Sequence, residues 1–274
     1  MKTVAYMGYS VDMINALNNN IDYDLKYIVG KKGRLSEEYY IIARNSNALF
    51  FEINDQVEVL KAISVFHEID AIFIYRFEYI IPKELVKSFH FINFHGGDLR
   101  TNRGAHALVW SILLREPKTM LSCYEISGDG IDEGYLIDTF EVKISNNDTP
   151  STLYKKMISG IPELLEKCSE YLNNGTKGPI IEGGVYRRKI KKSDFTINFD
   201  MDSIDEIRAK ILSQQPYYGA IVVIDGKEYR VKDFKIRKAK SKKAESGTKF
   251  IKISNEKVIL TERNRELVLW YREE

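Results

Sequence analysis

The segment FINFHGGDLRTNRGAHALVW, residues 91–110, is the part of the sequence that indicates the fold most clearly. An apolar run ends in Asn93 and His95, a polar loop containing Gly96-Gly97 follows, and a second apolar run begins at Gly104. This order predicts a buried strand, a loop at its carboxyl end and then a helix. Because side chains alternate along a strand, Asn93 and His95 are expected to share one face.

The residues before this segment repeat the same alternation of short apolar runs with polar or helical stretches. Strands are expected at 3–7, 25–29, 49–51, 71–75 and 89–94, and helices at 13–17 and 57–66. Such alternation is typical of the α/β class, in which crossover helices join the strands of a parallel sheet. We therefore predict a Rossmann-like domain.

The residues after the segment change character once along the chain. A helix over 104–114 is apolar nearly all round and is expected to be buried on several sides. A strand pair should follow at 120–126 and 135–142. Thr149-Pro150 should begin one helix that reaches Leu172. Beyond Gly183-Gly184 we expect a helix at 204–212 and strands at 220–224, 229–236, 250–253, 258–261 and 267–271, with a solvated lysine-rich loop at 235–243. The predicted domains are 1–184 and a smaller β-rich domain, 185–274.

Composition restricts the class of protein. The 274 residues are 44% hydrophobic and 29% charged, which indicates a folded chain with an apolar core and a polar surface. No apolar run approaches the ~20 residues that span a bilayer, and the N-terminus does not resemble a signal peptide, so we expect a cytoplasmic protein without a membrane partner. Two cysteines, Cys123 and Cys168, are too few for a disulfide framework.

Charge is distributed unevenly. Residues 1–185 hold 19 Lys and Arg against 25 Asp and Glu, whereas the other 89 residues hold 22 against 14, so the net charges are −6 and +8. A basic C-terminal third suits a phosphate-bearing ligand or RNA. Lysines that are simply solvated on strands and loops explain it equally well.

Asn93, His95 and Asp132 suit an acyl-transfer reaction. His95 can take the proton of an attacking amine, Asp132 can orient and support the imidazole, and the Asn93 amide can stabilise an oxyanion. The alternative for His95 is a structural role at a strand end. Cys123 lacks an adjacent histidine for nucleophilic catalysis. His90, His95 and His106 lack acidic or cysteine ligands at a recognised spacing, so no metal is expected, and no nucleotide-binding glycine motif is present.

Several short motifs carry a family resemblance. They are Asn93-Phe94-His95-Gly96, Arg103-Gly104, Gly130-Ile131-Asp132-Glu133-Gly134, YRFEYIIP at 75–82 and RAKILSQQPYYGA at 208–220. Over roughly residues 1–235 the chain resembles the folate-dependent formyltransferases, most closely the nucleotide-sugar N-formyltransferases. The family's usual Ser-Leu-Leu-Pro is replaced here by Gly97-Asp98-Leu99-Arg100, so the contacts of that loop cannot be carried over.

The resemblance implies a fold, a reaction and site residues. Residues 1–184 would be the catalytic domain, with Asn93, His95 and Asp132 as catalytic residues and 10-formyltetrahydrofolate as formyl donor. The resemblance places the pterin against Phe77, Tyr79, Ile80, Ile81, Gly130, Ile131 and Gly134. An acceptor that carries a nucleotide diphosphate would be bound by Arg76, Arg103, Tyr217 and Tyr218. For each of these residues, a purely structural role is the alternative.

Within the resemblance the implied acceptor is the primary amine of a nucleotide-linked amino sugar used for bacterial surface glycans. Methionyl-tRNA stays open because of the basic C-terminal domain, although residues 30–47 are short where tRNA-dependent enzymes carry an insertion. Glycinamide ribonucleotide is excluded, since such an enzyme would leave about ninety residues unexplained. A non-catalytic nucleotide-sugar binding protein on the same fold is a further alternative. The C-terminal sheet could also form a homodimer interface.

Overall fold

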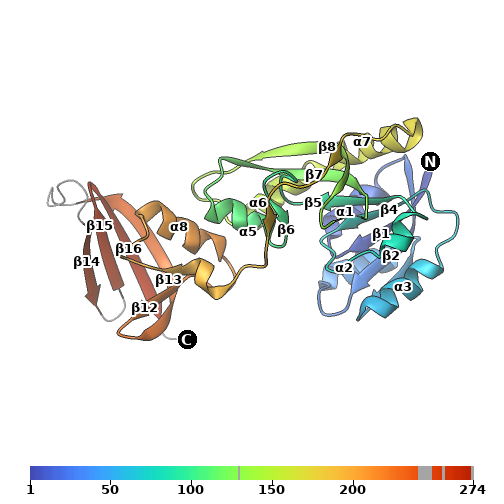
Figure 1. The fold of residues 1–274 in the computed structure, drawn as a ribbon. Helices are drawn as coiled ribbons and strands as arrows, with labels where there is room; N and C mark the ends of the chain where they lie inside the picture. The colour runs from blue at the N-terminus through green and yellow to red at the C-terminus, as the bar shows by residue number, and fades with distance from the viewer. Residues whose placement is uncertain (129, 240–248, 255–256, 273–274) are drawn as a thin grey trace. The chain divides into compact units, whose positions relative to one another are not determined.

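The computed structural model describes residues 1–128, 130–239, 249–254 and 257–272, which form two compact units (Figure 1). Unit 1 comprises Met1–Gly104, Thr119–Val142 and Tyr154–Arg187, and unit 2 comprises Ala105–Lys118, Lys143–Leu153 and Arg188–Glu274. Two early segments of the chain therefore group with the C-terminal residues. The division into domains 1–184 and 185–274 stays a proposal.

Unit 1 is built on one eight-stranded sheet with the strand order β3-β2-β1-β4-β5-β7-β8-β9. Its strands are β1 (Lys2–Gly8), β2 (Tyr23–Lys31), β3 (Leu49–Ile53), β4 (Ala71–Tyr75), β5 (Phe91–His95), β7 (Lys118–Ile126), β8 (Gly134–Lys143) and β9 (Ile180–Ile181), and a separate ladder joins β6 (Arg103–Gly104) to β10 (Tyr186–Arg187). The first five strands in the order are parallel, and β7 pairs antiparallel with β5. The predicted Rossmann-like α/β class is confirmed.

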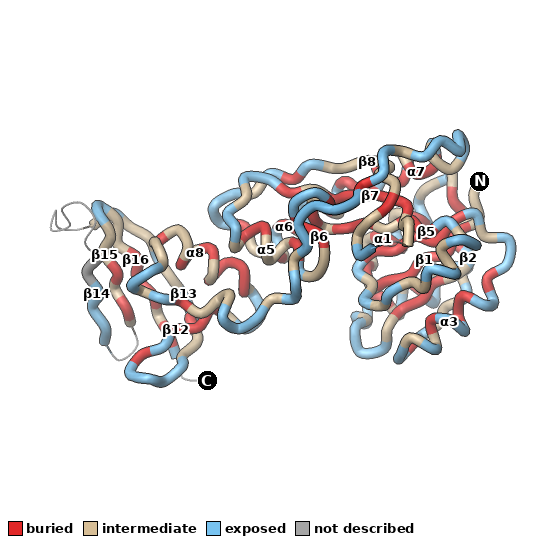
Figure 2. Tube along the Cα trace, viewed as in Figure 1, coloured by how far each residue is buried: buried red, intermediate tan, exposed pale blue. Residues whose placement is uncertain are grey.

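Helices cover both faces of this sheet, and its central strands β1, β4 and β5 are mostly buried (Figure 2). The helices are α1 (Val11–Asn18), α2 (Glu37–Asn45), α3 (Gln56–Ser64), α4 (Lys83–Val86), α6 (Pro150–Ile158) and α7 (Ile161–Asn174). Val59 and Ile63 of α3 share a core cluster with Met7 of β1. Tyr23 of β2 donates to the Leu165 carbonyl of α7 at 2.6 Å. Burial on both faces explains why these strands read as continuous apolar runs.

The helix predicted from Thr149 to Leu172 is two helices in the structure. It breaks at Gly160, where a Cβ atom would lie 2.2 Å from Cγ of Phe140, and Pro162 stands at the start of α7. A proline fits the first turn of a helix but not its interior, so Pro162 is a signal for the break. The sequence prediction also lacked α2, whose N-cap Ser36 accepts a hydrogen bond from the Tyr39 backbone N–H at 3.2 Å.

Unit 2 contains a six-stranded sheet with the order β11-β12-β13-β16-β15-β14. Its elements are α5 (Ala107–Leu113), the 3-10 helix η1 (Lys192–Phe195), β11 (Thr196–Ile197), α8 (Ile204–Ser213), β12 (Ile221–Ile224), β13 (Lys227–Lys238), β14 (Lys249–Ser254), β15 (Lys257–Glu262) and β16 (Arg265–Arg272). The predicted β-rich character is confirmed. The lysine-rich loop begins later than expected, because Lys235 and Lys238 lie in β13, paired with β16. Residues 240–243 lie outside the described residues.

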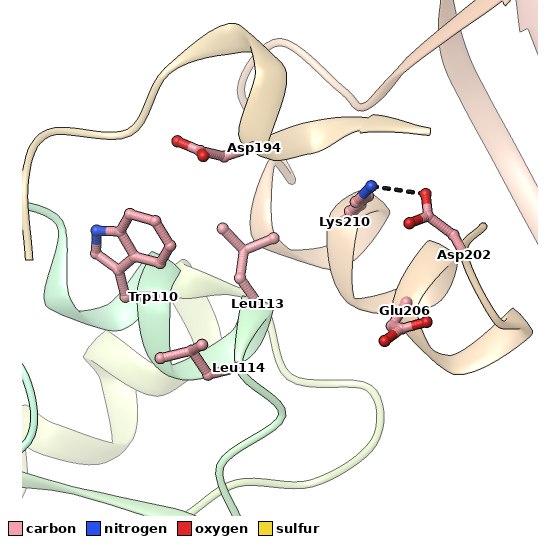
Figure 3. A pocket seen from close by; sticks show the side chains of 7 residues that line it. All are labelled: Trp110, Leu113, Leu114, Asp194, Asp202, Glu206 and Lys210. Carbon is pink, nitrogen blue, oxygen red and sulfur yellow. Dashed lines mark hydrogen bonds and ion pairs between the residues drawn. The ribbon is translucent and has the colours of Figure 1, made fainter. Parts of the chain in front are cut away.

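Helix α5 has an open side, although its apolar sequence predicted burial on several sides. Trp110, Leu113 and Leu114 line a pocket of about 250 Å³ together with side chains from α8 and the segment before it (Figure 3). Leu114 is 41% exposed. Across the pocket, Lys210 of α8 forms an ion pair with Asp202 at 2.6 Å. The apolar residues of α5 therefore form a pocket wall as well as core.

Over the residues that the structure describes, no helix has the length and apolar character needed to cross a membrane.

Candidate active site

Asn93 and His95 lie at the carboxyl end of β5, and the antiparallel strand β7 supplies their neighbours. Tyr124 stands opposite Asn93 and Ser122 stands opposite His95 in the strand register. Directly opposed residues share a face of the sheet, so these four side chains come from one surface. The Asn93 Nδ2 donates to the Tyr124 hydroxyl at 2.8 Å.

Asp132 joins this group from the loop between β7 and β8. Its Oδ1 accepts a hydrogen bond from the Tyr124 hydroxyl at 2.9 Å, and its Oδ2 accepts from the Gly104 backbone N–H at 2.7 Å. The same Oδ2 lies 3.5 Å from Nδ1 of His95. The structure thus brings together the three residues that the sequence singled out, although 37 positions separate His95 from Asp132 along the chain.

The backbone carbonyl of Asn102 determines how the His95 ring is held. His95 is 8% exposed, and its Nε2 lies 2.8 Å from this carbonyl oxygen. Because a carbonyl oxygen only accepts, Nε2 carries the hydrogen, and in the neutral ring Nδ1 has the free lone pair. Nδ1 is also the nitrogen nearer Asp132. Proton uptake at Nδ1 would create a cation with an acceptor at each nitrogen.

Two loops that meet at the site are tied together by Arg103. This buried guanidinium pairs with Glu133, next to Asp132, and its Nη1 lies 3.4 Å from the Ile131 carbonyl oxygen. Gly104 follows at a position where a Cβ would lie 2.3 Å from the Arg187 carbonyl oxygen, so the β6–β10 ladder requires glycine there. Arg103 therefore holds the site together structurally, and substrate contact by Arg103 stays a prediction.

The loop that departs from the family pattern, 97–100, is ordered by its own residues. Asp98 Oδ1 accepts from the Arg100 backbone N–H at 2.9 Å, and the Gly97 carbonyl accepts from the Ser122 hydroxyl at 2.7 Å. Leu99 is 2% exposed and belongs to the core cluster that contains Tyr124. The altered loop thus still packs against the site.

The segment expected to face the donor lies on the α3 side of the sheet. Phe77, Tyr79 and Ile81 are partly buried against the core cluster that includes α3. Ile80 is 71% exposed, and its carbonyl accepts from the Gln56 amide at 3.1 Å. Ile80 is therefore the member of this segment whose apolar side chain is open to a ligand.

The second segment expected to face the donor is the loop that carries Asp132. Ile131 is 49% exposed, whereas Gly134 is buried where a Cβ would lie 2.0 Å from the Glu125 carbonyl oxygen. Close strand packing alone requires glycine at 134. A Cβ on Gly130 would lie 2.4 Å from Glu133 Oε2. Residue 129 lies outside the described residues.

Arg76 stands just beyond β4, at the carboxyl ends of the parallel strands. Its guanidinium carbon lies 4.8 Å from the ring centre of Tyr9 and 4.6 Å from that of Tyr154. The Tyr154 hydroxyl lies 2.8 Å from the Ser10 hydroxyl and donates to Asp12 at 2.8 Å, which fixes that ring. Within the described residues Arg76 has no carboxylate partner, and it is exposed. A cation held by rings and left without a counter-charge suits an anionic group.

Tyr217 and Tyr218 follow α8 in unit 2 and are 60% and 75% exposed. Asn93, His95 and Asp132 belong to unit 1. A role for the two tyrosines at the site stays a prediction.

The sequence prediction missed Tyr124 and the two backbone groups that hold the catalytic candidates. Tyr124 carried little signal, since its strand also contains the hydroxyl-bearing side chains Thr119 and Ser122. The Asn102 carbonyl and the Gly104 N–H carried none, because every residue has these groups. Of the three histidines considered for a metal, His90 instead lies 2.6 Å from Glu125, and the described residues contain no grouping of three or more metal-ligating side chains.

Comparison with known proteins extends these observations. Residues 189–270 match the family model for the formyl transferase C-terminal domain. The methionyl-tRNA formyltransferase of Francisella philomiragia is 29% identical over 190 residues, which are 68% of this chain and 57% of that protein. The methionyl-tRNA formyltransferase of Pelagibacter ubique is 26% identical over 202 residues, 72% of this chain and 63% of that protein. The chain thus spans about three fifths of these relatives.

Solved structures share the fold at low sequence identity. The N-formyltransferase of Helicobacter canadensis, solved with folinic acid and dTDP-3-aminofucose, has a TM-score of 0.70, is 18% identical and covers 99% of this chain and 100% of its own. WlaRD, a sugar 3N-formyltransferase solved in the presence of dTDP and 5-N-formyl-THF, has a TM-score of 0.70 at 17% identity, with coverages of 100% and 99%. HypX of Aquifex aeolicus, solved with tetrahydrofolic acid, has a TM-score of 0.65 at 16% identity and covers 97% of this chain and 43% of its own.

The C-terminal match, the sequence relatives and the shared fold agree with one another. They agree as well with the motifs at Asn93–Gly96 and Gly130–Gly134. The chain is thus similar to the formyltransferases in its C-terminal residues 189–270, in its sequence relatives and in its fold.

Proposed function

We propose that this protein transfers a formyl group from 10-formyltetrahydrofolate to the primary amine of a nucleotide-linked amino sugar. The observation that carries the proposal is the convergence of Asn93, His95 and Asp132 on a formyltransferase fold. Tyr124 joins Asn93 to Asp132 by hydrogen bonds, and Asp132 Oδ2 lies 3.5 Å from His95 Nδ1. These residues provide an oxyanion donor, a base and a carboxylate that supports the base.

Each of the three residues has a task in the proposed reaction. The amine attacks the formyl carbon and a C–N bond forms, while His95 Nδ1 takes the amine proton and Asp132 supports the resulting imidazolium. Asn93 has two amide hydrogens; one is used by Tyr124, and the other can donate to the oxyanion. The bond from the formyl carbon to N10 of the folate then breaks, and His95 returns the proton to the leaving nitrogen.

Features of the described residues support a folate donor. Ile80 and Ile131 present exposed apolar side chains on the two segments expected to face the donor. Flat heterocycles bind well against apolar side chains and free backbone groups. WlaRD and HypX, which share the fold, were solved with folate compounds.

The shared fold and Arg76 support a nucleotide-sugar acceptor. WlaRD and the Helicobacter canadensis enzyme match this chain almost end to end, and both were solved with dTDP or a dTDP-linked amino sugar. Arg76 offers an exposed cation beside Tyr9 and Tyr154 that suits a diphosphate. Nucleotide sugars are made in the cytoplasm, so we propose that compartment and a role in surface-glycan synthesis.

Methionyl-tRNA is the second candidate acceptor. The sequence relatives quoted above are methionyl-tRNA formyltransferases, and residues 186–274 carry a net charge of +8. A basic surface favours binding to RNA. A non-catalytic sugar-nucleotide binding protein has weaker support, since the site retains its three polar residues.

A formyl-transfer assay tests the proposal. The purified protein is incubated with 10-formyltetrahydrofolate and a panel of 3-amino and 4-amino dTDP-, UDP- and GDP-sugars, with methionyl-tRNA in parallel. We expect turnover with a sugar, and a loss of ~10²-fold or more in His95→Ala. Formylation of tRNA alone would contradict the sugar assignment. Folate binding without turnover of any amine would favour the binding protein.

A further inference from the structure

Tyr124 occupies the centre of the site, although the proposed reaction gives it no task. Its hydroxyl lies 2.8 Å from Asn93 Nδ2 and 2.9 Å from Asp132 Oδ1, and the residue is 1% exposed. It is therefore the link between the oxyanion donor and the carboxylate that supports the base.

The direction of both hydrogen bonds follows from the chemistry of the partners. An amide nitrogen can only donate, so the phenol oxygen accepts from Asn93, and the phenol O–H donates to the Asp132 carboxylate. Burial and the neighbouring Asp132 charge raise the pKa of Tyr124 well above its ordinary value. The phenol consequently keeps its proton throughout the pH range in which the protein would work.

We propose that Tyr124 is a positioning residue for this site, an inference that rests on the proposed function. Its first effect is on Asn93. An Asn side chain can turn either its oxygen or its NH₂ group toward a neighbour. The Tyr124 hydroxyl already donates its hydrogen to Asp132, so it can only accept a hydrogen bond, and only the NH₂ group of Asn93 can donate one. Tyr124 thereby fixes the amide with its second N–H available for the oxyanion.

The second effect of Tyr124 is on the position of the Asp132 carboxylate. The phenol O–H donates to Oδ1 of Asp132, and the Gly104 N–H donates to Oδ2, which is also the atom 3.5 Å from His95 Nδ1. One donor on each oxygen fixes the plane of the carboxylate. Tyr124 therefore helps to hold Oδ2 of Asp132 beside His95.

The strand register explains why this position can serve both partners. Tyr124 stands directly opposite Asn93 in the β5–β7 pair, so their side chains leave the same face of the sheet at neighbouring positions. Asp132 reaches the phenol from the loop that follows the same strand. One rigid strand thus fixes groups that come from two parts of the chain.

Tyr124→Phe removes the hydroxyl and retains the ring, and Tyr23→Phe is the matched control. Tyr23 is also buried, at 5% exposure, and its hydroxyl donates to the Leu165 carbonyl on α7. Within the described residues this hydroxyl makes no hydrogen bond to Asn93, His95 or Asp132. The control therefore measures what the loss of one buried hydroxyl does to this unit. Steady-state kinetics and the NMR signals of the Asn93 side-chain NH₂ group are recorded for both variants.

We expect Tyr124→Phe to lower kcat about tenfold to a hundredfold, the range for a lost hydrogen bond to a charged group, with KM changed less than about threefold. The NMR signals of the Asn93 side-chain NH₂ group should shift, because the phenol that accepts its hydrogen bond is gone. Tyr23→Phe should leave kcat and these signals unchanged. Wild-type kcat together with unmoved Asn93 amide signals in Tyr124→Phe would overturn the inference. If the wild-type protein transfers no formyl group, the proposed function fails, and the substrate-free amide signals still decide the role of Tyr124.

Discussion

Replacement of Asp132 by asparagine tests the charge relationship at the centre of the site. Asp132→Asn keeps the shape of the side chain and removes the charge that faces His95 across 3.5 Å. At an effective dielectric constant of about 20, two unit charges at that separation attract by about 5 kcal/mol, which is a ceiling for the support that the carboxylate gives the imidazolium.

The hydrogen bonds of Asp132 determine how much of this ceiling is lost. The Gly104 N–H and the Tyr124 O–H both donate to the carboxylate, and an amide can accept from only one of these two sides. If the new amide oxygen faces Gly104, its NH₂ group faces a phenol that already accepts from Asn93. Since ~1.4 kcal/mol corresponds to a tenfold change in rate, we expect kcat to fall by ~10² to 10³.

The assay is formyl transfer at saturating donor and acceptor, with a thermal unfolding scan to verify the fold. Asp138→Asn is the matched control, because Asp138 lies on β8 in the same unit and accepts from the Thr139 backbone N–H at 2.7 Å. The variant Asp138→Asn should retain its rate. A kcat for Asp132→Asn within about threefold of wild type would refute the reasoning, because the carboxylate would then not support the base.

Three further predictions follow from single contacts. Asn93→Ala should lose about 3 kcal/mol of transition-state stabilisation in kcat, and an unchanged kcat would remove Asn93 from the mechanism. Arg76→Gln should raise KM for a nucleotide-sugar acceptor about tenfold or more with a smaller change in kcat, because a charged hydrogen-bond donor is lost, and an unaltered KM would exclude phosphate contact. In unit 2, Arg265 donates to both carboxylate oxygens of Asp205 at 2.8 and 2.9 Å and holds the pKa of Asp205 below its ordinary value. A lowered pKa stabilises the fold above the unfolded-state pKa of about 4, and the stabilisation is lost as the pH falls through the folded-state value. Thermal unfolding of Asp205→Asn should therefore show a lower Tm than wild type at pH 7 and a smaller difference at pH 3, and a difference independent of pH would contradict the ion-pair reading.

Helix boundaries show where reading the sequence succeeded and where it failed. The apolar periodicity at 56–64 and 204–213 is intrinsic to those segments, so helices α3 and α8 were foreseen. The need for glycine at 160 depends on Phe140 of β8, which a reading of the local sequence does not reveal, although Pro162 indicates the break locally. Periodicity reports which residues face a core, but it does not report which distant side chain fills a particular space.

Arg103 shows the same limit within the site. In the sequence, Arg103 stands next to a glycine after a polar loop, and this position fits a contact with substrate and an ion pair equally well. The choice depends on Glu133, thirty positions later, which the fold brings to the guanidinium. Arg76 is the opposite case, because folding supplies two aromatic rings and no carboxylate among the described residues.

The α/β class, the β-rich C-terminal part and the candidate set Asn93, His95 and Asp132 could be predicted from the sequence. These features depend on local apolar patterning and on residue types that few structural roles require. The packed fold was needed to show which nitrogen of His95 faces Asp132, that Tyr124 joins Asn93 to Asp132, and that backbone groups at 102 and 104 contact His95 and Asp132. Hydrogen bonds between segments far apart in the chain depend on ångström-scale distances, and only the packed sheet and its loops determine those distances.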